Sequence, residues 1–355
     1  MKIKKNALLN VFVSLVLIVI LYFGCLYLTV KSTPTPLTNV QFKKLEDILP
    51  RDCNIWLIFT KVTNKSSLNI KFGELLQNLL NTSSIPLKFH IIVDEKSKNI
   101  ASNKLSEVVY KTNRSITYSF YDFDECASKI GDIVSTMTPF FSSKPGTYYS
   151  DALFYISLGL YRIAPVTQDT AILLDCDLYF KKDIALLFEE FKRFKPTALF
   201  GLAPELTPVY RHILHMYKLK HRTTFGEFYH DSIISSKEAH PKGFQGYNSG
   251  VVLVKLKELR QSKEFSKLIA KSKIRNLTES YRFRGHLGDQ DFYTLIGYEY
   301  PHLIQTLNCG FNRQLCTWWR DHGYHEIFDH YFKCEHPTVV LHGNCNTKIP
   351  KEITF

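Results

Sequence analysis

Two aspartates at the end of an apolar run are residues whose types and spacing could do chemistry. Asp175 and Asp177 close the stretch AILLDCD, in which four apolar residues lead directly into the carboxylates. Such a run predicts a buried strand, and residues i and i+2 of a strand point to the same side. Two carboxylates on one side repel each other unless a cation lies between them, and their oxygens suit Mn²⁺ or Mg²⁺. The pair therefore predicts a divalent metal site.

Asp-x-Asp is by itself a weak pattern, and the chain contains two further copies. Asp122 and Asp124 follow a weaker apolar run, and we interpret them as a turn. Asp289 and Asp291 lie in RGHLGDQDFYT, a polar stretch before an apolar helical segment. For a lone copy, a capped loop with a solvated carboxylate is the simpler interpretation. The apolar lead-in favours the metal site only for the first pair.

Polar side chains also lie beside two other predicted strands. The stretch YNSGVVLV places Asn248, Ser249 and Gly250 directly before a strand. In VVLHGNCNTK, His342 stands at a strand end close to Asn344. In open α/β sheets, ligands bind beyond the carboxyl ends of the strands. We expect these stretches to converge on one site, with His342 as a third metal ligand.

Two classes of metal-using enzyme fit AILLDCDLYF. A phosphohydrolase of the haloacid-dehalogenase type would use the first aspartate as a nucleophile, but its motif has Thr or Val where this chain has Tyr179. A sugar-nucleotide glycosyltransferase would use the pair to hold a metal that neutralises the leaving diphosphate. The chain has no Walker loop, G-x-G-x-x-G or G-x-S-x-G stretch, so nucleotide hydrolases, dehydrogenases and esterases lack support.

The elements that must position these residues follow an alternating pattern. Short apolar strands between helical segments predict an α/β fold with a largely parallel sheet, buried on both faces. Asp183 is the expected N-cap of one helix and Pro196 its stop. The predicted strands are Ile55–Thr60, Phe89–Val93, Ile116–Phe120, Thr170–Leu174, Ala198–Leu202, Val251–Val254 and Val339–Leu341. The predicted helices are Phe72–Leu80, Tyr149–Tyr161, Asp183–Phe194 and Leu256–Ala270.

The N-terminus predicts membrane attachment. Residues 7–30 are uncharged and mostly apolar, long enough to cross a hydrocarbon core of roughly 30 Å. Three lysines precede this span, which places residues 1–6 in the cytosol. We expect a signal anchor, a short stem over 31–50 and a lumenal catalytic domain over 51–355. Sequons at Asn64, Asn81, Asn113 and Asn276 fit a lumenal domain.

The positions of the cysteines predict disulfides, and the net charge indicates the kind of ligand. Four of the eight cysteines, Cys309, Cys316, Cys334 and Cys345, crowd into the segment 298–355 without Cys-x-x-Cys spacing. In an oxidising lumen they are expected to form two disulfides, and three pairings remain open. The net charge of +12 is spread along the chain, which favours anionic ligands but not nucleic acid.

Several long stretches of the chain carry a family resemblance. The stretches LLDCDLYF, YNSGVVL, RGHLGDQDFYT, FNRQLCTWWRDHGY and LHGNCNTKIP together resemble glycosyltransferase family 8, and within it the xyloside α-1,3-xylosyltransferases. The resemblance implies a GT-A fold and a single-pass type II enzyme of the endoplasmic reticulum membrane. Such an enzyme transfers xylose from UDP-α-xylose to the xylose of xylosyl-glucose on EGF-like repeats, as in Notch.

The resemblance also implies roles for individual residues. Asp175, Asp177 and His342 match the ligands of Mn²⁺, with Mg²⁺ as the alternative ion. The residues that match the UDP-sugar site are Phe59, Thr60, Lys61, the backbone of Cys176, Gln290 and Lys348. The residues expected on the acceptor side are Asn248, Ser249, Gly250, Leu287, Trp318, Trp319 and Asn344. Of the two adjacent tryptophans, we expect one to pack inward and one to be free to stack on a sugar or an EGF module.

Donor and product of that reaction are both α-linked, so the configuration is retained. A double displacement would need a carboxylate behind the anomeric carbon, and Asp289 and Asp291 are the nearby candidates. We favour a front-face reaction, with Asp289 fixing the loop of Gln290. The alternatives are a family 8 transferase that uses UDP-glucose or UDP-galactose, and a glycan-binding protein that kept the fold without turnover.

Overall fold

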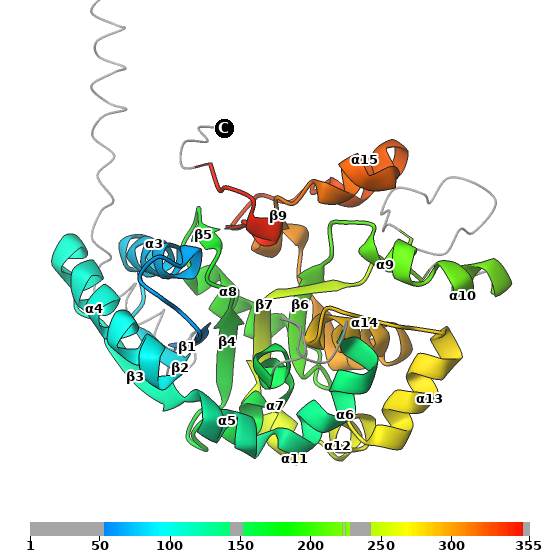
Figure 1. The fold of residues 1–355 in the computed structure, drawn as a ribbon, viewed down its shortest axis with the longest axis horizontal. Helices are drawn as coiled ribbons and strands as arrows, with labels where there is room; N and C mark the ends of the chain where they lie inside the picture. Colours follow the sequence, from blue (N-terminus) through cyan, green and yellow to red (C-terminus); the bar gives the residue numbers. More distant parts are fainter. Residues whose placement is uncertain (1–52, 143–151, 222, 224, 228–242, 351–355) are drawn as a thin grey trace, which may run out of the picture. The chain divides into compact units, whose positions relative to one another are not determined.

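The computed structural model describes residues 53–142, 152–221, 223, 225–227 and 243–350 (Figure 1). Its main sheet has seven strands in the order β3-β2-β1-β4-β7-β6-β8. Neighbouring strands are parallel except around β7, which runs antiparallel to β4 and β6. The predicted α/β fold with a mostly parallel sheet is therefore confirmed. The strands are β1 Cys53–Phe59, β2 Leu87–Val93, β3 Thr117–Asp122, β4 Thr170–Leu174, β6 Phe200–Pro204, β7 Tyr247–Lys255 and β8 Ile304–Thr306.

Helices flank this sheet because its central strands are apolar on both faces. Ile55, Leu57 and Ile172 are fully buried, as a parallel sheet covered on two sides requires. The helices before β6 are α3 Ser67–Thr82, α4 Glu95–Thr112, α5 Phe123–Lys129, α6 Gly131–Phe141, α7 Ile156–Ile163 and α8 Ala185–Glu190. Those after β6 are α9 Val209–Ile213, α10 His215–Lys220, α11 Leu256–Gln261, α12 Lys263–Leu268, α13 Lys271–Tyr281, α14 Asp289–Glu299 and α15 His325–Phe332.

Two local expectations are wrong. The helix expected over Leu256–Ala270 is two helices, because the Ser262 side chain accepts a hydrogen bond from Phe265 N at 3.1 Å and starts α12. The expected turn at Asp122 and Asp124 is the start of α5, where Asp122 accepts from Glu125 N at 2.9 Å. In both cases a side-chain cap decided the boundary.

A second, three-stranded sheet in the order β5-β10-β9 lies at the carboxyl end of β4. Its strands are β5 Leu178–Phe180, β9 Arg313–Gln314 and β10 Val340–His342. The C-terminal strand expected over Val339–Leu341 therefore belongs to this small sheet and not to the main one (Figure 1). The difference matters because β10 pairs antiparallel with β5, which directly follows the two aspartates.

Two disulfides close the C-terminal segment, as predicted. Cys309 pairs with Cys334, and Cys316 pairs with Cys345. The predicted membrane span over residues 7–30, the tail before it and the stem over 31–50 all lie outside the described residues. Among the residues that the structure does describe, no helix is both long and apolar enough to cross a bilayer.

Candidate metal and sugar-nucleotide site

The structure brings the three predicted metal ligands together. Asp175 follows β4, Asp177 precedes β5, and His342 ends β10. One ligand atom from each residue lies within 4.8 Å of the others. Nε2 of His342 is 3.3 Å from Asp177 Oδ1 and 3.6 Å from Asp175 Oδ2. Two carboxylate oxygens and one imidazole nitrogen form a donor set that fits Mn²⁺ or Mg²⁺.

His342 reaches this position because of a glycine on the neighbouring strand. The imidazole lies against Gly250, where an added Cβ would be 2.3 Å from Cε1 of the ring. Its Nδ1 is 2.9 Å from Asn312 Oδ1, so the opposite nitrogen, Nε2, faces the carboxylates. Gly250 was predicted on the acceptor side of the site. The structure shows that it also makes room for the ring of His342.

A lysine supplies positive charge at the same site. Lys71 Nζ on α3 is 3.3 Å from Asp177 Oδ2 and 3.1 Å from Asn346 Oδ1. Although burial opposes the shift, the His342 ring and Lys71 together lower the pKa of Asp177. The pKa of His342 is raised by Asp177 and Asp175 against the effect of its burial. Shifted pKa values in one cluster of charged groups are typical of functional sites.

The start of β7 lies beside the aspartates because β7 runs antiparallel to β4. Asp175 N donates to Gly250 O at 2.9 Å, and the pairing of β7 with β6 shifts register between Leu202 and Ala203. Such a bulge re-aims side chains next to a site. Asn248 and Ser249 are therefore at the amino end of their strand, yet they lie at the same edge as the carboxyl end of β4.

Asp289 is held by two hydroxyl groups. Its Oδ1 accepts from Ser249 Oγ at 3.0 Å and its Oδ2 accepts from Ser157 Oγ. Burial raises the pKa of Asp289 to about 7, and these hydrogen bonds act in the opposite direction. The next residue, Gln290, accepts from Ser249 N at 3.2 Å. Asp289 thus ties the start of α14 to β7.

Asp291, although it shares the same motif, faces another way. It is fully buried and accepts from Leu287 N at 2.7 Å and from Tyr210 OH at 3.0 Å. Burial raises its pKa to about 7. It lies in the first turn of α14 and holds the preceding loop through Leu287 N.

Four of the residues expected at the UDP-sugar site lie at the ends of β1 and β4. The ring of Phe59 is buried against Phe72 at 4.3 Å, and Thr60 is buried, so their backbones are what a ligand can meet. Lys61 is exposed, has φ 58° and donates its N–H to Asp94 Oδ2. The Cys176 thiol is also buried, and burial raises its pKa, which argues against a nucleophilic role.

The two tryptophans separate as the sequence suggested. Trp318 is 49% exposed and stacks on His322 at 3.8 Å. Trp319 packs against the core and contacts the rings of His212 and Tyr324. Trp318 is therefore the more exposed of the two.

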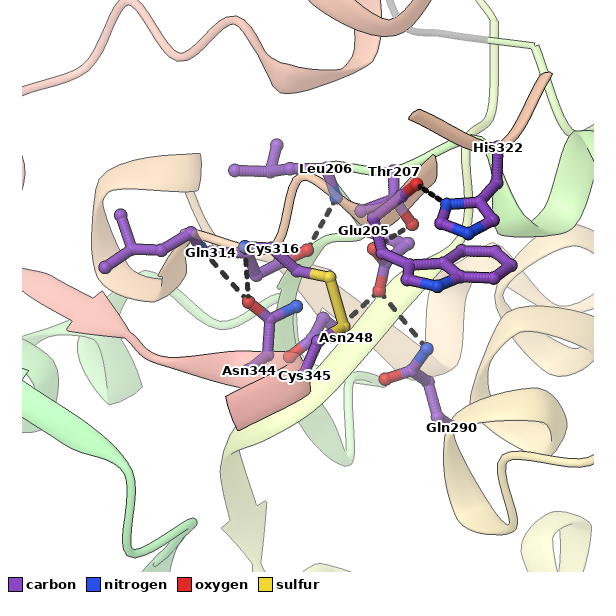
Figure 2. Close-up of a disulfide and its surroundings, with 12 residues drawn as sticks. Glu205, Leu206, Thr207, Asn248, Gln290, Gln314, Cys316, His322, Asn344 and Cys345 are labelled. Atoms are coloured by element: carbon purple, nitrogen blue, oxygen red, sulfur yellow. Dashed lines mark hydrogen bonds between the residues drawn. A yellow bond between two sulfur atoms is a disulfide. The ribbon is translucent and has the colours of Figure 1, made fainter. Parts of the chain in front are cut away.

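The remaining predicted site residues differ in how exposed they are. Leu287 is partly buried against the core, and Lys348 is exposed. The side-chain oxygen of Asn344 accepts from Leu315 N at 3.1 Å and Cys316 N at 2.9 Å. It lies next to the Cys316–Cys345 disulfide (Figure 2). This oxygen holds the chain, so an acceptor contact would fall to the side-chain nitrogen.

Three buried or charged residues of the site were not predicted. Lys71 lies on a helix face whose periodicity marks it only as a solvated lysine. Asn312 is inside FNRQLCTWWRDHGY, one of the stretches that carries the resemblance, but nothing in its type marks it as a partner of His342. Glu205 follows β6, so a polar residue at a strand end was the signal that could have identified it.

The chain was compared with known proteins. No family model matches it. Xyloside xylosyltransferase 1 of Homo sapiens is 40% identical over 330 residues, covering 91% of this chain and 81% of that protein. The Mus musculus protein of the same name is 38% identical with the same coverage.

Two solved structures agree with this similarity. Mouse xyloside xylosyltransferase 1 in its apo form superposes with a TM-score of 0.77 at 39% identity, covering 84% of this chain and all of that one. The galactosyltransferase LgtC, with donor and acceptor sugar analogues, gives a TM-score of 0.50 at 14% identity and supports the GT-A fold alone. With the sequence identity, the fold and the Asp-Asp-His cluster in agreement, the chain belongs to the xyloside xylosyltransferase family.

Proposed function

We propose that this chain is a retaining α-1,3-xylosyltransferase. Its sugar donor is UDP-α-xylose, and its acceptor is the xylose of xylosyl-glucose on EGF-like repeats of the Notch type. The observation that carries the proposal is the convergence of Asp175, Asp177 and His342 at the sheet edge of a chain in this family. The basic charge of the chain also suits a diphosphate ligand.

The three ligand residues hold Mn²⁺ in this proposal, with Mg²⁺ as the alternative. When bound, the ion supplies positive charge against the departing diphosphate. Lys71 adds positive charge beside Asp177, and Gly250 leaves room for the His342 ring. The start of α14, with Gln290 and Asp289, orients the sugar against the acceptor.

We favour a front-face reaction, in which the leaving diphosphate takes the acceptor proton. Both oxygens of Asp289 accept hydrogen bonds from serine hydroxyls, and Asp291 is fully buried. Neither carboxylate presents a free oxygen to an anomeric carbon. This geometry supports the front-face reaction over a double displacement.

The decisive experiment measures UDP release by the purified full-length chain. UDP-xylose and a xylosyl-glucoside are supplied with Mn²⁺, with Mg²⁺ or with EDTA. We expect turnover that depends on the metal and on the disaccharide, and that is lost in Asp177→Asn. Absence of metal-dependent turnover would defeat the proposal. Turnover with UDP-glucose or UDP-galactose in place of UDP-xylose would keep the enzyme class and change the specificity.

We also propose a lumenal catalytic domain in the endoplasmic reticulum, anchored by residues 7–30. One sequon asparagine, Asn113, is exposed at the left-handed end of α4 and can carry a glycan without disturbing the fold. The test is expression of the full-length chain in animal cells. We expect endoglycosidase to increase the mobility of the chain, Asn113→Gln to remove one step of that shift, and the domain to resist protease in sealed microsomes. Protease sensitivity there would reverse the topology.

A further inference from the structure

Glu205 is a buried carboxylate that no predicted role includes. It follows β6 and is 3% exposed. Its Oε1 accepts from Thr207 Oγ1 at 2.7 Å, and its Oε2 accepts from Asn248 Nδ2 at 2.9 Å and Gln290 Nε2 at 3.2 Å (Figure 2). The partners are neutral side chains, and within the described part of the chain no ion pair reaches this carboxylate. Burying a carboxylate in this way costs free energy, which suggests that its acceptor oxygens serve a purpose.

A directed series of hydrogen bonds begins at Glu205. Because Asn248 gives its Nδ2 to Glu205, its Oδ1 faces the other way and accepts from Asn312 Nδ2 at 2.8 Å and Gly250 N at 3.0 Å. Because Asn312 gives its Nδ2 to Asn248, its own Oδ1 faces Nδ1 of His342 at 2.9 Å. The carboxamide oxygen only accepts, so Nδ1 of His342 must carry a proton.

We propose that Glu205 is a positioning residue that sets the direction of this amide series. By doing so, it keeps the proton of His342 on Nδ1 and leaves the lone pair of Nε2 for the metal. The partner of the far nitrogen fixes which nitrogen of a metal-bound histidine is the ligand. Oε2 of Glu205 accepts whether or not Oε1 is protonated, so the direction does not depend on the ionisation of Glu205. This inference rests on the proposed metal site but not on the identity of either sugar.

Two substitutions of Glu205 separate its acceptor oxygen from its charge. Glu205→Gln can keep an oxygen toward Asn248 and Gln290 while its nitrogen donates to Thr207 Oγ1. Glu205→Met fills the same volume and removes the acceptor. We expect Glu205→Gln to bind Mn²⁺ within about threefold of wild type, and Glu205→Met to bind it about 10- to 100-fold more weakly.

Binding of Mn²⁺ is measured from the EPR signal of the free ion, with the full-length chain and without sugar substrates. The matched control is Glu190→Met. Glu190 is also buried, at 6% exposed, but it lies at the end of α8 and pairs with Arg193 in the turn that follows. We expect this control to leave Mn²⁺ affinity unchanged. Thermal unfolding of each variant shows whether the fold is kept.

A second variant tests direction itself. Asn312→Asp places an acceptor-only side chain between Asn248 and His342, where it can hold the Nδ1 proton without help. In a chain that keeps Glu205, the new aspartate would place an oxygen against Asn248 Oδ1. Two acceptors would then be in contact, so Mn²⁺ affinity should fall. In Glu205→Met, Asn248 is free to turn, so the same change should restore affinity by about tenfold, a coupling that a double-mutant cycle measures.

Several results would overturn the inference. One is Glu205→Met binding Mn²⁺ as wild type does. Another is a Glu205→Gln variant that folds but binds Mn²⁺ more than about tenfold more weakly than wild type, which would assign the effect to the charge of Glu205. A third is Asn312→Asp raising affinity in both backgrounds, which would show a general effect of negative charge. If Glu205→Met does not fold, Glu205→Gln and the single Asn312→Asp still decide. Wild type that binds Mn²⁺ but transfers no xylose would defeat the proposed function and leave this inference intact, whereas wild type that binds no Mn²⁺ would defeat both.

Discussion

Three copies of Asp-x-Asp in this chain have three different environments. Asp122 caps a helix, Asp175 and Asp177 face a histidine, and Asp289 holds two serines. The apolar lead-in separated the metal pair from the other two because only a buried strand delivers both carboxylates to one side of a sheet edge. The role of Asp122 is local, because it caps its helix through Glu125 N, whereas the role of Asp289 depends on serines from other elements.

Asp289→Asn tests the front-face reaction. An asparagine has only one acceptor atom for the two serine hydroxyls, so the start of α14 and Gln290 should shift. We expect kcat to fall by up to about 100-fold, as small misplacements at a reacting centre can cause. Mass spectrometry of the intact protein after incubation with UDP-xylose should show no added sugar. A covalent xylosyl-enzyme on any variant would favour double displacement instead.

Asp291→Asn tests a pH effect on stability. The native pKa of Asp291 is raised by burial to about 7 from an ordinary value of 3.8. Between those values the native state binds more protons than the unfolded state, so its contribution to stability declines as pH rises through this window. We expect the free energy of unfolding of the variant to fall less steeply with rising pH than that of wild type. Denaturant unfolding at a series of pH values in EDTA measures this. The control is Asp321→Asn at an exposed site. If the free energy of unfolding of the Asp291 variant changed with pH as steeply as that of wild type, the prediction would be wrong.

At the scale of elements, the site depends on one reversed strand and one small sheet. Because β7 is antiparallel to β4, its first residues meet the carboxyl end of β4. The pairing of β10 with β5 then brings His342 opposite Leu178, one residue beyond Asp177. Strand periodicity identified these segments, but their direction and partners come from long-range pairing.

Gly250→Ala tests the close approach of β7 and β10. The added Cβ would lie 2.3 Å from Cε1 of His342, so the ring must move away from the carboxylates. We expect Mn²⁺ affinity to fall by at least about tenfold. Gly131→Ala is the control, since a Cβ there meets nothing within 4 Å. Unchanged affinity in the Gly250 variant would show that the site tolerates a displaced ring.

At the scale of the whole molecule, distant parts of the chain build one site. The C-terminal segment carries both disulfides, and in the chain-entropy description loops of 25 and 29 residues contribute about 3–4 kcal/mol each. It also carries His342 and Trp318. The segment therefore unites metal binding with the exposed surface on which we expect the acceptor.

Trp318→Ala tests that surface. The side chain is 49% exposed, so its loss should leave thermal stability nearly unchanged. We expect the KM for a xylosyl-glucosylated EGF-like repeat to rise by about 3- to 10-fold, in line with the value of one aromatic contact. The KM for the free disaccharide should change less if the ring contacts the EGF module, and equally if it contacts the sugar. Tyr110→Ala, at an 88% exposed residue, is the control, and no change in either KM would exclude Trp318 from the acceptor surface.

Much of the fold and part of the site could be predicted from residue order alone. The strand β4 was predicted with its bounds, because a short apolar run that ends at polar residues is typical of a buried strand. The four crowded cysteines predicted two disulfides, but their pairing needed the coordinates, since four cysteines allow three arrangements. Helix α4 was missed because its many charged residues weaken the apolar periodicity.

By itself, the sequence determined the metal-ligand types, the α/β class and the family, because these depend on local composition, periodicity and long specific stretches. Only the tertiary structure decided which way β7 runs, that β10 leaves the main sheet, and that Trp318 and not Trp319 is exposed. It also decided that Glu205, Asn248 and Asn312 form one directed series toward His342. Hydrogen-bond direction is a property of side chains that meet across 30 to 64 residues of chain, and no pattern of neighbouring residues encodes it.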